Sequence, residues 1–500
     1  MPRAIRLLSV ILILSGCTTA VSTPRNQEEV RPADAVKLAP PSGMNGGMIV
    51  ATTVSHDGAS LYYAIREPDG CVLERMSLAR RSDHRPTPLS FCPDRLSSLS
   101  DGSLVADGPD GAAWLEPDGT IRRRNVVAAL NASDFIESTD HGLVWHREGT
   151  TIELPRLRQP AILPKRPFVV GIEATRDGEQ LTRVDREGTR QAITTEPLAS
   201  IDSWAADPDG IEIVVSALRR AGGNAATQHD VGLVTVDGSD IRWIGPDPAD
   251  ETTVTWAPRG HKISYVVRLP DGAIIRTVHV PTGFEVVADL PYASIQGIAW
   301  EPKAEKFYVT WSSIEASSKI ESMTYAGRDR SVVVASEFSN QEPLDRIVAP
   351  GTTAVLIPPR VIRYGVKYPL ILWMVDDDPL AWSSARAAVV RDTDAGVLVV
   401  PGEHGALTKA FWSEVADLGW VDHSNIVVVA HDPAAVALSG APTGWNFTYL
   451  LPVRRGSVSG SAVQIRSSGP VSSVIRIPRQ FDPDEYASRV LREKFGREQR

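Results

Sequence analysis

The stretch Trp256–Val278, WAPRGHKISYVVRLPDGAIIRTV, contains the signals that decide the fold of this 500-residue chain. It holds two β-rich runs, and a tight turn, Pro-Arg-Gly or Pro-Asp-Gly, precedes each of them. Asp-Gly supplies the positive φ angles that tight hairpin turns need. Ile263, Tyr265 and Val267 alternate with their neighbours, a pattern typical of half-buried strands. The stretch therefore predicts antiparallel strands joined by short hairpins.

The same unit recurs between residues 45 and 350, without long helical periodicity. Related runs are SHDGASLYYAI, GPDGAAWLEPDGTI, ATRDGEQLTRV and ADPDGIEIVVSAL. Trp204, Trp256 and Trp300 recur at roughly 45–50 residues, each shortly before a turn, and a unit of that length with four short strands is typical of a propeller blade. We expect a mainly β fold with a propeller of about seven blades over residues 45–350; a pair of β-sandwiches is the alternative.

The first residues, MPRAIRLLSVILILSGCTTA, have the layout of a secretory signal. Arg3 and Arg6 precede the apolar run Leu7–Leu14, which is shorter than the roughly 20 apolar residues that span a bilayer. The residues Leu14-Ser15-Gly16-Cys17 resemble the lipobox of bacterial lipoproteins. That resemblance implies that residues 1–16 are removed and that Cys17 is acylated, whereas an ordinary signal peptide with a chance cysteine is the alternative.

The resemblance to lipoproteins also implies a location. Thr18, rather than Asp, follows the cysteine, which implies a lipid anchor (palmitate among its chains) at the periplasmic face of the outer membrane. Two or three acyl chains anchor a protein stably where one does not. Residues 17–44 are polar, with scattered proline and charge, and we interpret them as a tether to the cell envelope.

Composition excludes several classes of function. The net charge of -9 is spread along the chain, and no basic stripe indicates nucleic-acid binding. With Cys17 acylated, Cys71 and Cys92 remain as a pair in an oxidising compartment. We expect a Cys71–Cys92 disulfide, with two buried free thiols as the alternative. Two cysteines without nearby histidines make a poor zinc site, so we expect no metal and no cofactor.

Residues 351–500 show a different pattern, in which strands alternate with helices. Apolar runs at Tyr368–Val375, Gly396–Val400 and Asn425–Ala430 predict buried strands. Helical spacing at Phe411–Leu418 and a capped segment at Pro483–Phe495 predict helices. Alternating strands and helices indicate a parallel sheet in an α/β layer.

Two motifs in this region resemble the prolyl oligopeptidase (dipeptidyl peptidase IV) family of serine peptidases. Tyr368-Pro369-Leu370-Ile371-Leu372-Trp373 is similar to a strand that enters the hydrolase sheet of that family. Residues 420–422, Trp-Val-Asp, followed by 425–427, Asn-Ile-Val, are similar to the approach to its nucleophile. The resemblance implies an N-terminal propeller followed by an α/β-hydrolase domain, here short and truncated.

The residues that carry the chemistry of such a hydrolase differ in this chain. The nucleophile of the family lies on a G-x-S-x-G turn between a strand and a helix. The matching stretch here is Ala430-His431-Asp432-Pro433-Ala434, with Asp432 in the serine position. The residue after the nucleophile donates its N–H to the oxyanion, but Pro433 has no N–H to donate.

The second oxyanion element and the base are also replaced. Where the family has His-Gly-Gly-Pro, this chain has Asp376, Asp377 and Asp378 followed by Pro379, which would oppose developing negative charge. The triad histidine must follow the nucleophile, and no histidine occurs after His431. Asp432 as an ester-forming nucleophile, as in haloalkane dehalogenases and epoxide hydrolases, meets the same obstacles. The three aspartates are more typical of a solvated loop than of a cation site.

The sequence therefore predicts a pseudoenzyme, an envelope lipoprotein that binds a peptide or a protein partner. One alternative is an active serine peptidase or isopeptidase of the same family, for which lasso peptides would be natural ligands. A second alternative is a propeller scaffold within an envelope assembly.

The lipobox yields a direct prediction. In membranes of an exporting bacterium, we expect mass spectrometry to find a mature chain that begins at acylated Cys17, because the apolar run directs export and the cysteine thiol accepts the lipid. The Cys17→Ser variant should keep residues 1–16 and carry no lipid. An unmodified N-terminus beyond residue 17 would contradict the lipobox.

Overall fold

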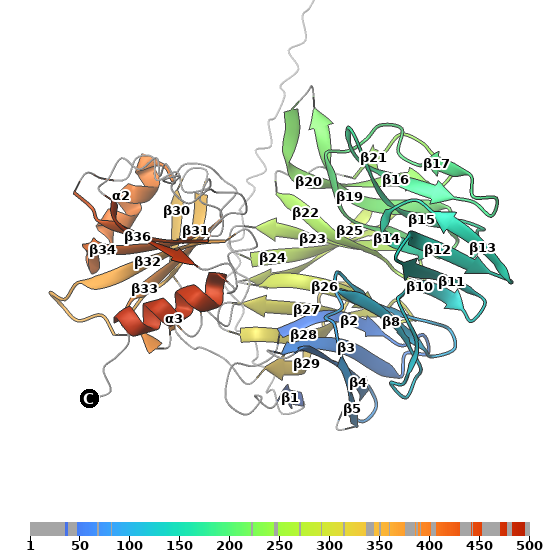
Figure 1. Cartoon of the computed structure of the whole chain (residues 1–500), viewed down its shortest axis with the longest axis horizontal. Coiled ribbons are helices and arrows are strands. Elements are labelled where there is room, and N and C mark those ends of the chain that lie inside the picture. Colours follow the sequence, from blue (N-terminus) through green and yellow to red (C-terminus); the bar gives the residue numbers. More distant parts are fainter. Residues whose placement is uncertain are drawn as a thin grey trace, which may run out of the picture.

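The computed structural model describes the greater part of the chain. The residues described are 36–38, 48–67, 70–81, 83–221, 224–244, 249–269, 272–291, 293–313, 316–336, 345–349, 352–359, 361–375, 386, 389–390, 392–401, 407–430, 442, 444–452, 471–477 and 483–495. Figure 1 shows them as two bodies, a large β-structure on the right and a smaller body of sheet and helices on the left. No helix among the described residues is long and apolar enough to cross a membrane.

The larger body consists of seven sheets, each built from four consecutive antiparallel strands, and one of them has a fifth strand at its edge. Blade I has β2 (Met48–Val54), β3 (Ser60–Glu67), β4 (Gly70–Ser77) and β5 (His84–Leu89). Blade II has β6 (Arg95–Ser98), β7 (Leu104–Gly108), β8 (Gly111–Leu115) and β9 (Ile121–Arg124). Blade III has β10 (Val126–Asn131), β11 (Asp134–Thr139), β12 (Gly142–Arg147) and β13 (Thr150–Leu154).

The remaining blades repeat this pattern. Blade IV has β14 (Leu157–Ile162), β15 (Val169–Thr175), β16 (Gly178–Val184) and β17 (Arg190–Ala192). Blade V has β18 (Ser200–Ala206), β19 (Glu212–Ala221), β20 (Asn224–Thr235) and β21 (Arg242–Trp243). Blade VI has β22 (Asp250–Trp256), β23 (Lys262–Leu269), β24 (Gly272–His279) and β25 (Phe284–Pro291). Blade VII has β26 (Ser294–Trp300), β27 (Lys306–Ser313), β28 (Ala316–Thr324) and β29 (Ser331–Ser336). The prediction of a mainly β fold with a seven-bladed propeller is confirmed.

Aspartate side chains stabilise the turns that the sequence marks. Asp57 Oδ1 accepts hydrogen bonds from Ala59 N at 2.9 Å and from Ser55 Oγ at 2.6 Å. The following Gly58 has a φ of 73°, a conformation that costs glycine little and other residues more. Asp101 Oδ1 accepts from Ser103 N at 3.0 Å in the equivalent turn of blade II. The Asp-Gly signals thus form the hairpin turns that the sequence predicts.

Apolar contacts between blades form the core of the propeller. Each pair of neighbouring blades shares one cluster of buried apolar side chains, which gives seven clusters among the described residues. Trp256 is in the cluster between blades V and VI, and Trp300 is in the cluster between blades VI and VII. A four-stranded sheet has two faces, so each blade needs a neighbour on both sides to remove its apolar faces from water.

Polar contacts complete the junction between blades VII and I. Ile49 N donates to Ser318 Oγ at 2.8 Å, and the hydroxyls of Thr52 and Thr310 lie 2.6 Å apart. Residues that the sequence assigned to a tether, β1 (Val36–Leu38), pair in parallel with β29 at the outer edge of blade VII. The ring is therefore closed by side-chain hydrogen bonds and by apolar packing between blades VII and I.

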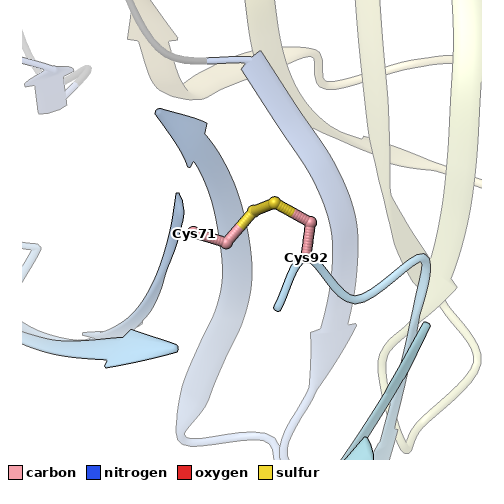
Figure 2. Close-up of a disulfide and its surroundings, with 2 residues drawn as sticks. All are labelled: Cys71 and Cys92. Carbon is pink, nitrogen blue, oxygen red and sulfur yellow. A yellow bond between two sulfur atoms is a disulfide. The ribbon is translucent and has the colours of Figure 1, made fainter. Parts of the chain in front are cut away.

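Cys71 and Cys92 form a disulfide, the pairing that the sequence favoured over free thiols (Figure 2). Cys71 lies in β4 and Cys92 lies in the connection between β5 and β6, with their Cα atoms 5.1 Å apart. Cys71 and Cys92 both pack in the cluster shared by blades I and II. The disulfide therefore reinforces that junction.

The smaller body is a seven-stranded sheet in the order β30-β31-β33-β32-β34-β35-β36. Its strands are β30 (Asp345–Ala349), β31 (Thr352–Ile357), β32 (Tyr368–Val375), β33 (Gly396–Pro401), β34 (Val421–Ala430), β35 (Phe447–Pro452) and β36 (Val471–Ile477). The last five in chain order pair in parallel, whereas β30 and β31 pair antiparallel. The chain passes from the propeller to this sheet between residues 336 and 345.

Helices cover both faces of the C-terminal sheet. Leu370, Leu372 and Met374 point into a core shared with α2 (Lys409–Asp417). The alternate residues of β32, Ile371, Trp373 and Val375, point into a second core shared with α3 (Pro483–Phe495). Because side chains of a strand alternate between faces, one apolar run serves both cores. The strands and helices that the sequence predicts here are present.

The ring closure yields a prediction. Ser318→Ala should lower the free energy of unfolding by about 1–3 kcal/mol, because the buried Ile49 N–H would lose its acceptor. Urea denaturation monitored by tryptophan fluorescence measures the change. Ser100→Ala, at an exposed serine of the propeller, is the matched control and should change stability by about 0.5 kcal/mol or less. Equal effects of the two variants would contradict the role of Ser318.

Candidate functional site

The carboxyl ends of the parallel strands form the first candidate site. In open α/β sheets, ligands bind beside these ends, where the chain order reverses direction. Here β32 is flanked by β33 on one side and by β34 on the other. In the two ladders, Met374 of β32 pairs with Val400 and with Ala430. Chain segments that follow β32 and β34 therefore begin at neighbouring points of this edge.

The sequence-predicted site residues follow these strand ends. Asp376, Asp377 and Asp378 come directly after β32, and Asp432 and Pro433 come after β34; all five lie outside the described residues. Cys17 also lies outside them. The structure brings together the two strand ends, Val375 and Ala430, from which the expected site residues continue. No cluster of three metal-ligating side chains occurs among the described residues.

His423 is a histidine of this sheet, but it lies far from the carboxyl edge. It stands in β34, seven residues before Ala430, which corresponds to roughly 23 Å along the strand. Its ring stacks on Trp445 with centroids 4.1 Å apart. Burial and the nearby Lys367 lower the pKa of His423. This histidine therefore packs at the amino end of β34 and cannot act as a base at the other end.

The first strand of each blade lines the centre of the propeller and forms a second candidate region. In six of the seven blades, this strand has a register shift against the second strand. Gln159 and Thr253 have φ angles of 52° and 54° at such shifts. Bulges bend a strand and free backbone groups from the ladder. At five of the seven junctions the first strands of neighbouring blades contact one another, so the bends occur where these strands meet.

Side chains from the preceding blade satisfy the freed backbone groups. Thr253 N of blade VI donates to Asp202 Oδ2 of blade V at 3.0 Å, and Ile201 N of blade V donates to Glu179 Oε2 of blade IV at 2.7 Å. Ser318 of blade VII does the same for Ile49 N of blade I. The polar residues at the centre are thus largely structural.

Arg95 and two carboxylates form a charged group in this central region. Arg95 lies in β6 of blade II, and its Nη2 donates to Pro160 O of blade IV at 3.4 Å. Among the described residues, its Nη1 has no hydrogen-bond partner. Burial raises the pKa of Asp107 to about 6 despite the nearby Arg95, and burial also raises the pKa of Asp94. The sequence does not indicate this group, because single charged residues in short strands form no recognisable pattern.

An open pocket between blades II and III is lined by aromatic rings and guanidinium groups. Its volume is about 470 Å³. Arg122 lies 4.5 Å above Trp114, and Arg123 lies 4.5 Å above Phe135. Arg122 is also 3.4 Å from Glu116 Oε1, so its charge is partly balanced. Such a lining can hold a peptide through stacking and hydrogen bonds to its carbonyl groups.

Comparisons with known proteins identify the fold. No protein-family profile and no curated protein sequence matches the chain. Among solved structures, acylaminoacyl peptidase from Pyrococcus horikoshii is similar with a TM-score of 0.60, 8% identity and coverage of 90% of this chain and 95% of that one. A puromycin-hydrolyzing peptidase from Mycobacterium tuberculosis has a TM-score of 0.59, 10% identity and coverage of 83% and 80%. Prolyl oligopeptidase B from Galerina marginata has a TM-score of 0.55, 12% identity and coverage of 82% and 73%.

These neighbours are peptidases of the prolyl oligopeptidase type, with a seven-bladed propeller. The propeller of this chain has the fold of that class. At 8–12% identity, the likeness concerns the fold alone, because one fold carries many activities and the site residues decide the chemistry.

The charged group at Arg95 yields a prediction for pH dependence. Asp107 has a pKa of about 6 in the folded chain, above its unfolded value, so the folded state holds its proton more tightly. Stability should therefore fall as pH rises from about 4 to 6, by roughly 2–3 kcal/mol from this group. Asp107→Asn should be more stable than the parent at pH 8 and equal to it at pH 4, as measured by urea denaturation.

The control for this experiment is Asp110→Asn, which removes one exposed carboxylate near the same hairpin. Its stability should follow that of the parent at both pH values. A loss of stability in Asp107→Asn at pH 8 would mean that the attraction between Asp107 and Arg95 outweighs the cost of burial, contrary to the direction of the pKa shift.

Proposed function

We propose that this chain is an envelope-anchored, catalytically inactive relative of prolyl oligopeptidase-type serine peptidases that binds a peptide or a protein partner. The observation that carries the proposal is the neighbouring placement of the ends of β32 and β34. The sequence continues from these ends with Asp376-Asp377-Asp378 and with His431-Asp432-Pro433. The sheet that would support a nucleophile is kept, while the residues for nucleophilic attack are replaced.

Physical chemistry supports the loss of catalysis. A proline after the nucleophile position removes one oxyanion donor, and the loss of one donor costs about 10²–10³ in rate. Carboxylates beside a developing oxyanion raise the energy of the transition state further. The described histidine of the C-terminal sheet, His423, lies at the opposite end of β34. Each of these features would slow an ester or peptide hydrolysis, and together they favour binding without turnover.

Several surfaces support binding. The parallel sheet presents five strand ends at one edge, where ligands of α/β proteins bind. The pocket between blades II and III offers stacked guanidinium and aromatic groups. The lipobox at Cys17 would hold these surfaces at the outer membrane, facing the periplasm. An active peptidase or isopeptidase and a propeller scaffold are the alternatives that the experiment must separate.

A fluorophosphonate probe tests the loss of catalysis. We expect no covalent labelling of the purified full chain under conditions that label an active serine peptidase completely, because the serine, the base and an oxyanion donor are replaced. Asp432→Ser should also remain unlabelled, since Pro433 and the absent base are unchanged. Labelling of the parent chain that disappears in a single serine-to-alanine variant would refute the proposal.

The fate of bound peptides separates the three functions. The full chain is incubated with a fluorescent random-sequence decapeptide pool, and bound peptides are recovered and analysed by mass spectrometry. The proposal expects bound, intact peptides. Cleaved peptides would indicate an enzyme, and no bound peptide would favour the propeller scaffold.

A further inference from the structure

The loop between β31 and β32 exposes an unusual amount of apolar surface. Residues 361–367, Val-Ile-Arg-Tyr-Gly-Val-Lys, are all exposed. Tyr364 is 107% exposed, and Val361, Ile362 and Val366 are 56%, 50% and 42% exposed. Eight large apolar side chains are exposed in the described part of the chain, and these four lie within six consecutive residues. Such a concentration marks an interaction site, whereas single exposed residues are ordinary.

Hydrogen bonds fix the loop in this exposed conformation. Val366 N donates to Arg363 O at 3.1 Å across a turn, and Gly365 in that turn has a φ of 78°. Arg363 N donates to the hydroxyl of Tyr368 at 3.1 Å, and Lys367 Nζ donates to Gly419 O. Tyr364 therefore stands at the tip of a turn that is held at both ends, and it does not fold back onto the sheet.

The chemistry of the loop matches a bilayer interface. Aliphatic and aromatic side chains enter the boundary between headgroups and acyl chains, and neighbouring basic side chains attract anionic headgroups. Arg363 and Lys367 lie on either side of Tyr364, and Arg360 precedes the exposed run in the sequence. The nearest acidic residue along β34, Asp422, accepts hydrogen bonds from Ser424 N and Oγ. Residues 360–367 thus contain three basic residues and no acidic one, a local excess of positive charge that suits an anionic surface, although the chain as a whole is acidic.

The size of the loop argues against a second copy of the chain as its partner. A stable protein interface buries about 800 Å² on each partner and involves some 20–30 residues. Seven consecutive residues in a turn offer much less, and the turn is no β-strand edge that could extend a sheet. Shallow insertion into a bilayer needs only a few side chains in addition to a lipid anchor.

We infer that the loop 361–367 inserts into the headgroup region of an anionic bilayer. The inference rests on the proposed lipid anchor, which would keep the loop close to the membrane. The loop leads into the amino end of β32, whereas the candidate site lies at the carboxyl end, roughly 25 Å away along the strand. Insertion would thus orient the C-terminal sheet with its carboxyl edge away from the lipid.

A local fluorescence probe tests the insertion. Tyr364→Cys is made in the full chain with Cys17→Ser, so that the new thiol alone reacts with an NBD dye while Cys71 and Cys92 stay in their disulfide. The matched control places the dye at Phe284→Cys, a side chain of the propeller that is 64% exposed. Both proteins are mixed with vesicles of phosphatidylcholine with or without one quarter phosphatidylglycerol. Both proteins keep residues 1–16, whose apolar run Leu7–Leu14 takes the place of the lipid as an anchor and affects the two probes equally.

The expected result is an increase of several-fold in NBD emission at position 364 with anionic vesicles, quenched by nitroxide-labelled lipid, and no such change at position 284. Arg363→Gln with Lys367→Gln should weaken the response about tenfold or more in vesicle titrations. A probe at 364 that stays aqueous would overturn the inference. So would an equal response to both vesicle types, or a signal without vesicles that grows with protein concentration.

Failure of this inference can be distinguished from failure of the proposed function. Lipid on Cys17 of the natural chain is read separately by mass spectrometry. Acylated Cys17 with an aqueous probe at 364 would refute the loop insertion alone, whereas unmodified Cys17 with an inserted probe would refute the anchor alone.

Discussion

Packing between blades is the constraint on which the rest of this structure depends. Each four-stranded blade has two apolar faces, and only its neighbours can cover them. One buried cluster therefore lies at every junction, including the junction between blades VII and I. That junction brings together residues more than 250 positions apart, such as Thr52 and Thr310. The ring cannot remain open at any point without exposing the faces of two blades.

Closure of the ring constrains the backbone conformation of the first strand in each blade. Crowding at the centre is accommodated by bulges in six of these strands. The preceding blade supplies side chains such as Asp202 and Glu179 to the freed N–H groups. The disulfide between Cys71 and Cys92 adds a covalent link at the junction of blades I and II. Several polar residues at the centre therefore stabilise the ring, and burial in the same region raises the pKa of Asp107 despite the nearby Arg95.

In the C-terminal sheet, the residues that form the apolar cores are distinct from the expected site residues, which follow the strand ends. Alternate residues of β32 fill two cores, and α2 and α3 close the two faces. Most apolar contacts of these cores lie within the strands and helices, and Val389, Val390, Leu407 and Trp445 add to them from the connecting segments. In the sequence, His431-Asp432-Pro433 follows β34 directly, and the cores described above do not require a particular residue type at these positions. For the same reason, similarity to peptidase structures identifies a fold and leaves activity to the site residues.

The sequence by itself determined the features that depend on local chemistry. Asp-Gly turns and the recurring tryptophans predicted the blades, apolar runs predicted β32 and β34, and the cysteine count predicted the disulfide. Tertiary structure decided the features that depend on distant partners. These are the pairing of β1 with β29, the bulges, the Arg95 group and the exposure of Tyr364. Local signals act within a few residues of the chain, whereas burial and pairing depend on which segments the closed ring and the sheet bring together.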